Sequence, residues 1–375
     1  MTAVCATAQT PYITEVLDYS PAPGQFVNVY PPYEQGDTRQ AMLDKCLDRI
    51  GGTADRMVSL GSFGGSITFA FDHMVPNVPG EYDFKVMGNS FFKPNAQNGD
   101  GGNSEPGIIM VSHDANGNGL ADDPWYEIAG SEYGTATATD GYEVTYTRPA
   151  ADHQPVLDPE QTAFSDIDYI SWTDNKGNSG KLPKLVEHTQ SYFPEWDVQP
   201  SYTFSGTRLA GNARLEGSRI KEWVLYPYAW GYADNVPNDE PAAGTKIEWA
   251  VKPDGSKADL PGINFVRVYT SQLEVYGALG EVSTEVCGAV DLHALAGIDA
   301  ATADRDGFFA RHDGERLYLT GVAAGTEVAV SDMQGRTVAR MTFPQADAAM
   351  PCRLNSGIYV VRSGARAVKL MVRQR

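Results

Sequence analysis

The chain has 375 residues, of which 42% are hydrophobic and 10% aromatic, and it carries a formal net charge of -19. This composition supports folded domains and excludes an intrinsically disordered protein. The acidic balance excludes nonspecific nucleic-acid binding, which depends on basic surfaces, and no run of about 18 apolar residues predicts a transmembrane helix.

Residues 1–9 resemble the end of a secretory signal, with Ala6-Thr7-Ala8 as an A-x-A cleavage site. The segment therefore predicts an exported protein. An ordinary terminus and a lipid-bearing Cys5 are the alternatives.

One segment, Asp37–Ile50, has the pattern of a helix. Asp37 is the expected N-cap, Gln40 completes a capping box, and Gly51 ends the helix. Four apolar residues recur at helical spacing: Leu43, Cys46, Leu47 and Ile50.

The remaining pattern up to residue 293 is of short, β-rich segments separated by Gly, Pro, Asn and Asp. The expected strands are Arg56–Leu60, Ser66–Phe71, Tyr82–Met87, Gly107–Ser112, Tyr142–Thr147, Tyr169–Thr173, Trp223–Tyr226, Lys246–Val251 and Phe265–Thr270. Because helices do not alternate with them, we predict an all-β, mostly antiparallel body over residues 10–293. A jelly-roll-like β-sandwich with one short helix at one end fits this pattern.

The stretch from Asp114 to Glu127 has the composition of a calcium loop. Oxygen-bearing residues alternate around Gly119 as in an EF-hand loop, although Trp125 replaces the closing glutamate. The expected Ca²⁺ ligands are Asp114, Asn116, Asn118, the Leu120 carbonyl, Asp122, and a closing carboxylate from Asp123 or Glu127. An Asn/Gly/Asp-rich turn without an ion is the alternative.

Aromatic residues gather between residues 192 and 232. Flat rings can stack on sugar or corrin-like faces while polar side chains bind the edges. Loop positions favour binding, so the predicted ligand residues are Trp196, Tyr228, Trp230, Tyr232 and Asp234. Packing inside the sandwich is the alternative for such rings.

Catalytic motifs are scarce. The sequence contains no G-x-S-x-G elbow and no H-E-x-x-H zinc motif. Paired carboxylates could support glycoside hydrolysis, and the acidic residues that lie beside aromatics are Asp72, Glu195, Asp197 and Asp234. The four cysteines show no zinc spacing, and the sequence permits a Cys46–Cys287 disulfide without establishing it.

The C-terminal part differs in charge. Residues 307–375 contain 10 Lys/Arg and 5 Asp/Glu, which leaves 19 Lys/Arg and 43 Asp/Glu for residues 1–306. Residues 294–306 are the expected linker, and residues 307–375 the expected small immunoglobulin-like sandwich. Its predicted strands are Arg316–Leu319, Glu327–Asp332, Thr337–Phe343, Gly357–Arg362 and Ala367–Arg373.

Two resemblances add expectations. Val328–Val338, Leu354–Arg362 and Lys369–Arg373 resemble the C-terminal sorting domain of type IX secretion in Bacteroidetes, which implies contact with secretion machinery and display on the outer cell surface. The body resembles Bacteroidetes cell-surface proteins of undefined function through Val16–Asn28, Val58–Gly65, Asp114–Tyr133, His188–Trp196, Trp230–Asn235 and Gly280–Glu285. Relatives of that family often lie near cobalamin or glycan uptake systems.

The expected function is therefore calcium-stabilised binding of an extracellular glycan or corrinoid-like ligand at the cell surface, without catalysis. A glycan-active hydrolase and a purely structural surface protein are the alternatives.

Overall fold

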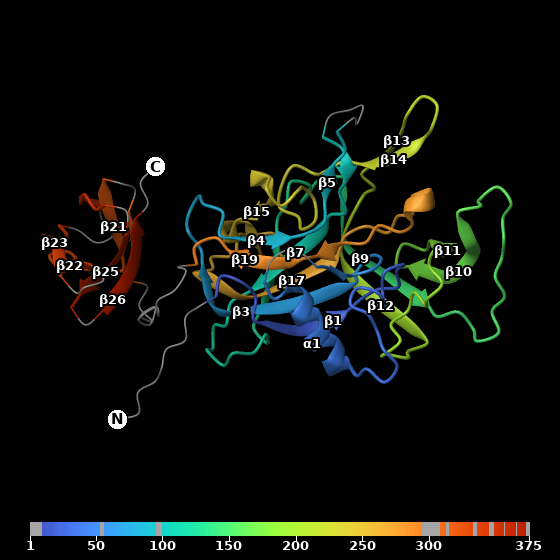
Figure 1. The fold of residues 1–375 in the computed structure, drawn as a ribbon, viewed down its shortest axis with the longest axis horizontal. Coiled ribbons are helices and arrows are strands. Elements are labelled where there is room, and N and C mark those ends of the chain that lie inside the picture. Colours follow the sequence, from blue (N-terminus) through green and yellow to red (C-terminus); the bar gives the residue numbers. More distant parts are fainter. Residues whose placement is uncertain are drawn as a thin grey trace. The chain divides into compact units, whose positions relative to one another are not determined.

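The computed structural model describes residues 10–52, 56–94, 100–294, 308–312, 315–332, 336–344, 349–355, 357–364 and 366–372 (Figure 1). The chain divides into two compact units, of which the larger runs from Tyr12 to His293 and the smaller contains the residues from Ala294 onward. The expected signal remnant with Cys5, and residues 295–306 of the expected linker, lie outside the described residues.

The helix α1 runs from Arg39 to Ile50, so its N-cap lies one residue after the expected cap, Asp37. Thr38 is the N-cap, because its hydroxyl accepts a hydrogen bond from the Ala41 amide at 3.2 Å. Asp37 instead binds the Lys45 ammonium at 2.7 Å. The apolar face of the helix is buried, and Gly51 ends it as expected, with its amide bonded to the Leu47 carbonyl.

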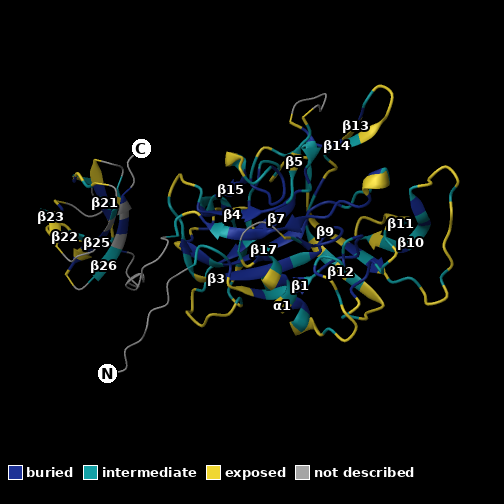
Figure 2. Cartoon of the chain, in the orientation of Figure 1, coloured by how far each residue is buried: buried dark blue, intermediate teal, exposed yellow. Residues whose placement is uncertain are grey.

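The central sheet of the larger unit has six strands in the order β1-β3-β17-β7-β8-β16, and every pairing in it is antiparallel. Its members are β1 (Glu15–Ser20), β3 (Ser66–Pro76), β17 (Gly262–Thr270), β7 (Gly107–Ser112), β8 (Trp125–Ile128) and β16 (Ala250–Val251). Val266 of β17 lies opposite both Phe69 and Val111, and all three side chains are fully buried. Figure 2 shows this sheet as the most buried part of the unit.

A second sheet has the order β11-β10-β9-β12. Its strands are β9 (Ala138–Thr147), β10 (Phe164–Asp174), β11 (Ser179–Leu185) and β12 (Ser201–Leu209). One face of it buries aromatic side chains, including Phe63, Tyr142 and Tyr146, in a separate apolar cluster. Along β12, Ser201, Thr203 and Ser205 are exposed, whereas Thr207 and Leu209 are buried, in agreement with an antiparallel sheet that has one solvated face.

Short strands complete the larger unit. One sheet has the order β13-β14-β6-β5, another β15-β4-β19, and β18 pairs with β2. Their bounds are β2 (Val58–Ser59), β4 (Phe84–Met87), β5 (Phe91–Phe92), β6 (Gly102–Asn103), β13 (Ala213–Glu216), β14 (Glu222–Leu225), β15 (Gly244–Thr245), β18 (Glu285–Val286) and β19 (Gly288–Asp291). Three 3₁₀ turns lie between them: η1 (Pro241–Ala243), η2 (Ile247–Trp249) and η3 (Gly277–Leu279). The expected strand Lys246–Val251 is therefore wrong over Lys246–Trp249, and only Ala250–Val251 is a strand.

The C-terminal unit contains seven strands within its described residues, arranged as β20-β21-β24 and β23-β22-β25-β26. The strands are β20 (Phe309–His312), β21 (Arg316–Thr320), β22 (Glu327–Asp332), β23 (Thr337–Thr342), β24 (Ala349–Pro351), β25 (Gly357–Ser363) and β26 (Arg366–Val372). They enclose their own apolar core, in which Leu317, Val328 and Phe343 are fully buried. Two antiparallel sheets around one core form a small β-sandwich.

The expected all-β, mostly antiparallel fold with one α-helix is confirmed across the described residues. None of the helices in this part of the chain has the length and apolar character needed to cross a membrane. Cys46 and Cys287 are both buried, and the disulfide that the sequence permits between them is not formed.

Candidate functional site

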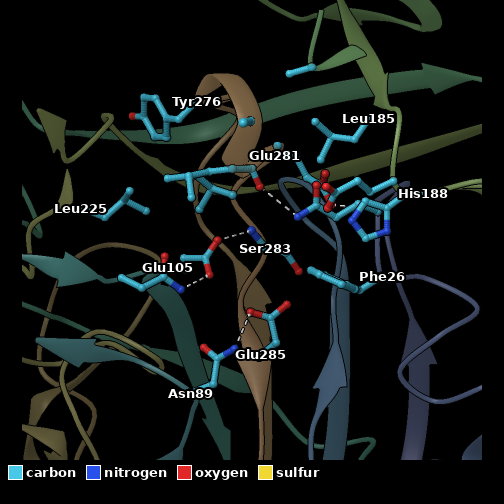
Figure 3. Close-up of a pocket in the computed structure, with 18 of the residues that line it drawn as sticks. Phe26, Asn89, Glu105, Leu185, His188, Leu225, Tyr276, Glu281, Ser283 and Glu285 are labelled. Carbon is cyan, nitrogen blue, oxygen red and sulfur yellow. Dashed lines mark hydrogen bonds between the residues drawn. The ribbon is translucent and has the colours of Figure 1, made fainter. Parts of the chain in front are cut away.

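A pocket of about 590 Å³ opens in the larger unit where several connections between sheets meet (Figure 3). Gln25 and Phe26 reach it from the segment after β1, and Leu185 reaches it from the end of β11. The segment around η3 forms another wall and continues through Ser283 into β18. The lining residues are Gln25, Phe26, Asn89, Phe91, Asn103, Glu105, Ala163, Leu185, Val186, Glu187, His188, Leu225, Tyr276, Ala278, Leu279, Gly280, Glu281, Val282, Ser283 and Glu285.

Three carboxyl groups meet at one side of this pocket. Glu105, Asp234 and Glu285 each place one carboxylate oxygen within 4.8 Å of the others. Glu105 lies between β6 and β7, Asp234 lies in the loop after β14, and Glu285 begins β18. Within the described residues, these are the only His, Cys, Asp or Glu side chains that gather three ligand atoms in this way.

Backbone amides orient Asp234. Its Oδ1 accepts from the amides of Asn89 and Ser90, at 2.8 and 2.9 Å, and its Oδ2 accepts from the amide of Glu285 at 2.9 Å. Asp234 itself has a φ of 52°, a conformation that non-glycine residues adopt only when the surrounding structure compensates. The three amides supply that compensation.

The two glutamates are held less tightly. Glu105 accepts from the Ser283 amide at 3.1 Å and from the Asn103 side chain at 2.8 Å. Glu285 Oε2 accepts a long bond of 3.4 Å from Asn89 Nδ2, and the Ser283 and Ser59 hydroxyls also act on this carboxyl group and lower its pKa. Its Oε1 is buried and has no hydrogen-bond partner in the described part of the chain.

Burial controls the protonation of this cluster. Loss of solvation raises the pKa of Glu105 to about 7. Burial also raises the pKa values of Asp234 and Glu285 well above their usual range, and the charges of neighbouring carboxylates raise them further. No Lys, Arg or His forms an ion pair with any of the three among the residues that the structure describes. The cluster has no positive charge of its own.

The pocket wall also presents unused acceptor oxygens. Gln25 Oε1, Asn89 Oδ1 and Glu285 Oε1 are buried oxygens that line the pocket without a donor from the described residues. Glu281 Oε1 accepts from the Gln25 amide at 2.6 Å, and burial raises the pKa of Glu281 to about 8. Burial lowers the pKa of His188, whose ring lies edge-on to Phe26 at 4.9 Å. The pocket walls are therefore complementary to a ligand that offers hydrogen-bond donors or positive charge.

The expected calcium loop joins β7 to β8, and four of its predicted side-chain ligands point toward one another. Asp114 accepts from the Asn118 and Gly119 amides, at 3.0 and 2.9 Å, and Asn118 Nδ2 donates to Asp122 at 3.1 Å. Asn116 Nδ2 also approaches Asp122, at 3.4 Å. These bonds join the alternating polar residues of the loop to one another, and calcium binding there stays a prediction.

The three other expected ligands have different surroundings. Asp123 faces the same loop, because its Oδ2 accepts from the Ala115 amide at 3.1 Å, and Leu120 has an exposed side chain. Glu127 lies on β8 and accepts from the Thr207 hydroxyl of β12 at 2.7 Å. Burial raises the pKa of Glu127 to about 7. Thr207 is thus a direct partner of the Glu127 carboxylate.

The five predicted ligand-binding residues do not gather in one pocket. Trp196 stacks on Tyr19 with ring centroids 5.6 Å apart and lines a separate pocket of about 370 Å³. Trp230 packs on Trp249, with centroids at 4.4 Å. Tyr228 packs against Tyr232, which is buried and whose hydroxyl accepts from the Glu132 amide. Asp234 alone joins the carboxyl cluster.

The other acidic candidates for hydrolysis are also scattered. Asp72 binds His73 at 2.6 Å, Glu195 is exposed, and Asp197 lines the second pocket with Trp196. Of the three acidic residues that do meet, the sequence predicts Asp234 but not Glu105 or Glu285, although Glu281, Ser283 and Glu285 alternate along one segment. A period of two places such residues on the same side of an extended chain.

Comparisons with known proteins do not assign a function. No known family model matches the chain, and no curated protein matches it. A solved structure of native alpha-2-macroglobulin from Escherichia coli, spanning domains MG0-NIE-MG1, aligns with 88% of this chain and 99% of its own, at 14% identity and a TM-score of 0.15. A TM-score this low supports no inference about fold or function.

Proposed function

We propose that the larger unit binds an extracellular glycan, or a similar small molecule rich in hydroxyl groups, in the 590 Å³ pocket without transforming it. The observation that supports this is the set of buried acceptor oxygens on Gln25, Asn89 and Glu285 that no described donor satisfies. A buried polar oxygen without a partner costs about 1–3 kcal/mol, so a ligand hydroxyl that donates to it gains that energy on binding.

The apolar lining is consistent with such a ligand. Phe26, Phe91 and Tyr276 offer rings on which a sugar face can stack, and 56% of the Phe91 side chain is exposed. The volume lies within the range of about 300–1,000 Å³ that is typical of small-molecule sites. Stacking rings beside oriented acceptors distinguish this pocket from an ordinary surface hollow.

Removal of the exposed ring tests the proposal. We expect Phe91→Ala to weaken binding of a glycan found on an array by about five- to tenfold, because stacking against an aromatic face contributes roughly 1 to 1.4 kcal/mol. Titration calorimetry measures the affinity for this glycan, and the same chains are titrated with a panel of corrinoids. Leu157→Ala is the matched control, because Leu157 is 71% exposed and does not line the pocket. Equal affinities of the Phe91→Ala and wild-type chains would contradict the proposed site.

Hydrolysis is the second candidate. The observation that favours it is the approach of Glu105 to Glu285 within 4.8 Å beside an open pocket, since retaining glycosidases place two carboxyl groups about 5 Å apart. If the wild-type chain released reducing sugar from a bound glycan and Glu285→Gln did not, hydrolysis would be the function in place of binding without catalysis.

We also propose that the Asp114–Asp123 loop binds Ca²⁺ and stabilises the larger unit. Asp114, Asn116, Asn118 and Asp122 supply oxygen atoms of the type that Ca²⁺ prefers, and their mutual hydrogen bonds bring them together. An ion there would also offset part of the acidic excess.

Chelation tests the calcium loop. We expect EDTA to lower the Tm of the wild-type chain and 1 mM CaCl₂ to restore it, because a ligand that binds only the folded state stabilises it. Asp114→Asn is expected to remove most of this response. Asp152→Asn, at an exposed position outside the loop, serves as the control. A calcium response that Asp114→Asn leaves unchanged would exclude the loop as its source.

Export and surface display remain part of the proposal. They are supported by the A-x-A pattern in residues 1–9 and by the sorting-domain resemblance of the C-terminal unit. The unit that carries this resemblance is a compact β-sandwich with its own apolar core.

A further inference from the structure

We propose that the carboxyl cluster of Glu105, Asp234 and Glu285, beside the pocket, is a second divalent-cation site, separate from the Asp114 loop, that takes a hard cation such as Ca²⁺. The inference deepens the proposed function, because the cation would present open coordination positions to ligand hydroxyls. That second part rests on the proposed function, whereas cation binding itself does not.

The geometry supplies several oxygen donors at one place. Glu105, Asp234 and Glu285 bring ligand atoms within 4.8 Å of one another, a separation that one ion between them can bridge at metal–oxygen distances of about 2.3–2.6 Å. Figure 3 shows Glu105 and Glu285 on neighbouring segments, with Asn89 beside Glu285.

An independent observation points to a ligand in this cluster. Glu285 is only 3% exposed, yet its Oε1 has no hydrogen-bond partner in the described part of the chain. Asn89 Oδ1, next to it, is a second buried acceptor without a donor. A structural cluster would satisfy these oxygens internally, because buried polar groups almost always find a partner.

The charge of the cluster leads to the same conclusion. Three buried carboxyl groups at this separation repel one another when ionised, and burying an unpaired charge is costly. The protein has two ways to avoid this cost: protonation, or a bound cation. Because no described Lys, Arg or His pairs with the cluster, its ionised form can be compensated only by an ion from solution.

The donor type selects the cation. The three carboxylates and the Asn89 side-chain carbonyl all offer oxygen atoms. Oxygen donors of these kinds suit Ca²⁺, Mg²⁺ and Mn²⁺, whereas Zn²⁺ sites usually include His or Cys. Asp234 is fixed by three amides, and the two glutamates have fewer bonds and can adjust. A mixture of fixed and adjustable oxygen donors fits the irregular coordination of Ca²⁺ better than the strict octahedron of Mg²⁺.

Calorimetric titration of the full chain with CaCl₂ tests the proposal. The Asp114→Asn chain serves as the background, so that the loop does not contribute. We expect this chain to bind one Ca²⁺ and to gain Tm on its addition, and we expect Glu285→Gln in the same background to bind at least tenfold more weakly. Glu187→Gln is the matched control, since Glu187 lines the same pocket but is exposed and outside the cluster.

A measurement in EDTA separates lost binding from lost folding. Glutamine has the shape of glutamate and carries no charge that needs compensation, so Glu285→Gln is expected to keep the Tm of the cation-free chain while losing the calcium response. No calcium response in the Asp114→Asn chain, or a full response after Glu285→Gln, would overturn the cation site. Calcium binding without glycan binding would leave the cation site standing and remove only the proposed function. Glycan affinity that is the same in EDTA and in CaCl₂ would overturn the bridging role.

Discussion

The Gly65→Ala variant is expected to lose roughly 3 to 5 kcal/mol of unfolding free energy, through overpacking and a broken hydrogen bond. A Cβ at this position would lie 1.8 Å from the Leu60 carbonyl oxygen and 2.4 Å from the Ala22 amide nitrogen. Those two atoms form a hydrogen bond of 3.0 Å. Both belong to backbone, so no side chain can turn away to make room.

The same turn supports the pocket. The Gly61 amide donates to the Ser283 hydroxyl at 3.0 Å, and the Ser283 amide in turn donates to Glu105. The Thr270 hydroxyl, at the end of β17, donates to the Gly61 carbonyl at 2.8 Å. Movement of the turn would therefore shift the segment that carries Ser283 and Glu285.

Urea unfolding followed by tryptophan fluorescence measures this effect in the larger unit alone, because all six Trp residues lie within it. Gly52→Ala is the control, since a Cβ there meets no atom within 4 Å and the residue is not in the left-handed region. A Gly65→Ala chain as stable as Gly52→Ala would show that the turn relaxes at little cost.

The sequence predicted strands best where apolar residues alternate or run together. Gly107–Ser112 and Glu327–Asp332 have the same bounds as β7 and β22. The strand predictions failed where the conformation of a segment depends on its tertiary contacts rather than on its own pattern of apolar residues. Strand β12 was not expected, because Ser201–Leu209 is largely polar and owes its conformation to pairing with β9. Ile247–Trp249 has strand-like residues but forms a 3₁₀ turn between two short strands.

The candidate site was predictable only in part. Asp234 was named from its loop, but its partners Glu105 and Glu285 lie more than 50 residues away in the chain, and only tertiary structure brings them together. Among 48 acidic residues, composition cannot select such a trio. The alternation of Glu281, Ser283 and Glu285 is a local signal that could have found one wall of the pocket. By contrast, the proximity of the polar residues in the Asp114–Asp123 loop could be predicted directly, because they are close in sequence, whereas calcium binding there stays a prediction.

The second large effect is an unusual dependence of stability on pH. Burial raises the pKa of Glu281 from 4.5 to about 8, with a smaller contribution from the charge of Glu105. Between these values the folded chain keeps a proton that the unfolded chain has lost. The unfolding free energy therefore falls as pH rises, by as much as about 1.4 kcal/mol per pH unit for this group. From pH 5 to pH 8, we expect wild type to lose roughly 2 to 4 kcal/mol relative to Glu281→Gln.

Urea unfolding in EDTA at pH 5, 6, 7 and 8 measures this difference, and the comparison with Glu281→Gln separates Glu281 from the other carboxyl groups. Glu187→Gln, which removes an exposed carboxylate from the same pocket, is expected to follow wild type at every pH. Glutamine preserves an oxygen that can accept from the Gln25 amide, so the bond of 2.6 Å has a replacement. If Glu281→Gln and wild type changed in parallel from pH 5 to pH 8, Glu281 would be ionised in the folded chain, and the pocket would hold one more negative charge to attract a cation.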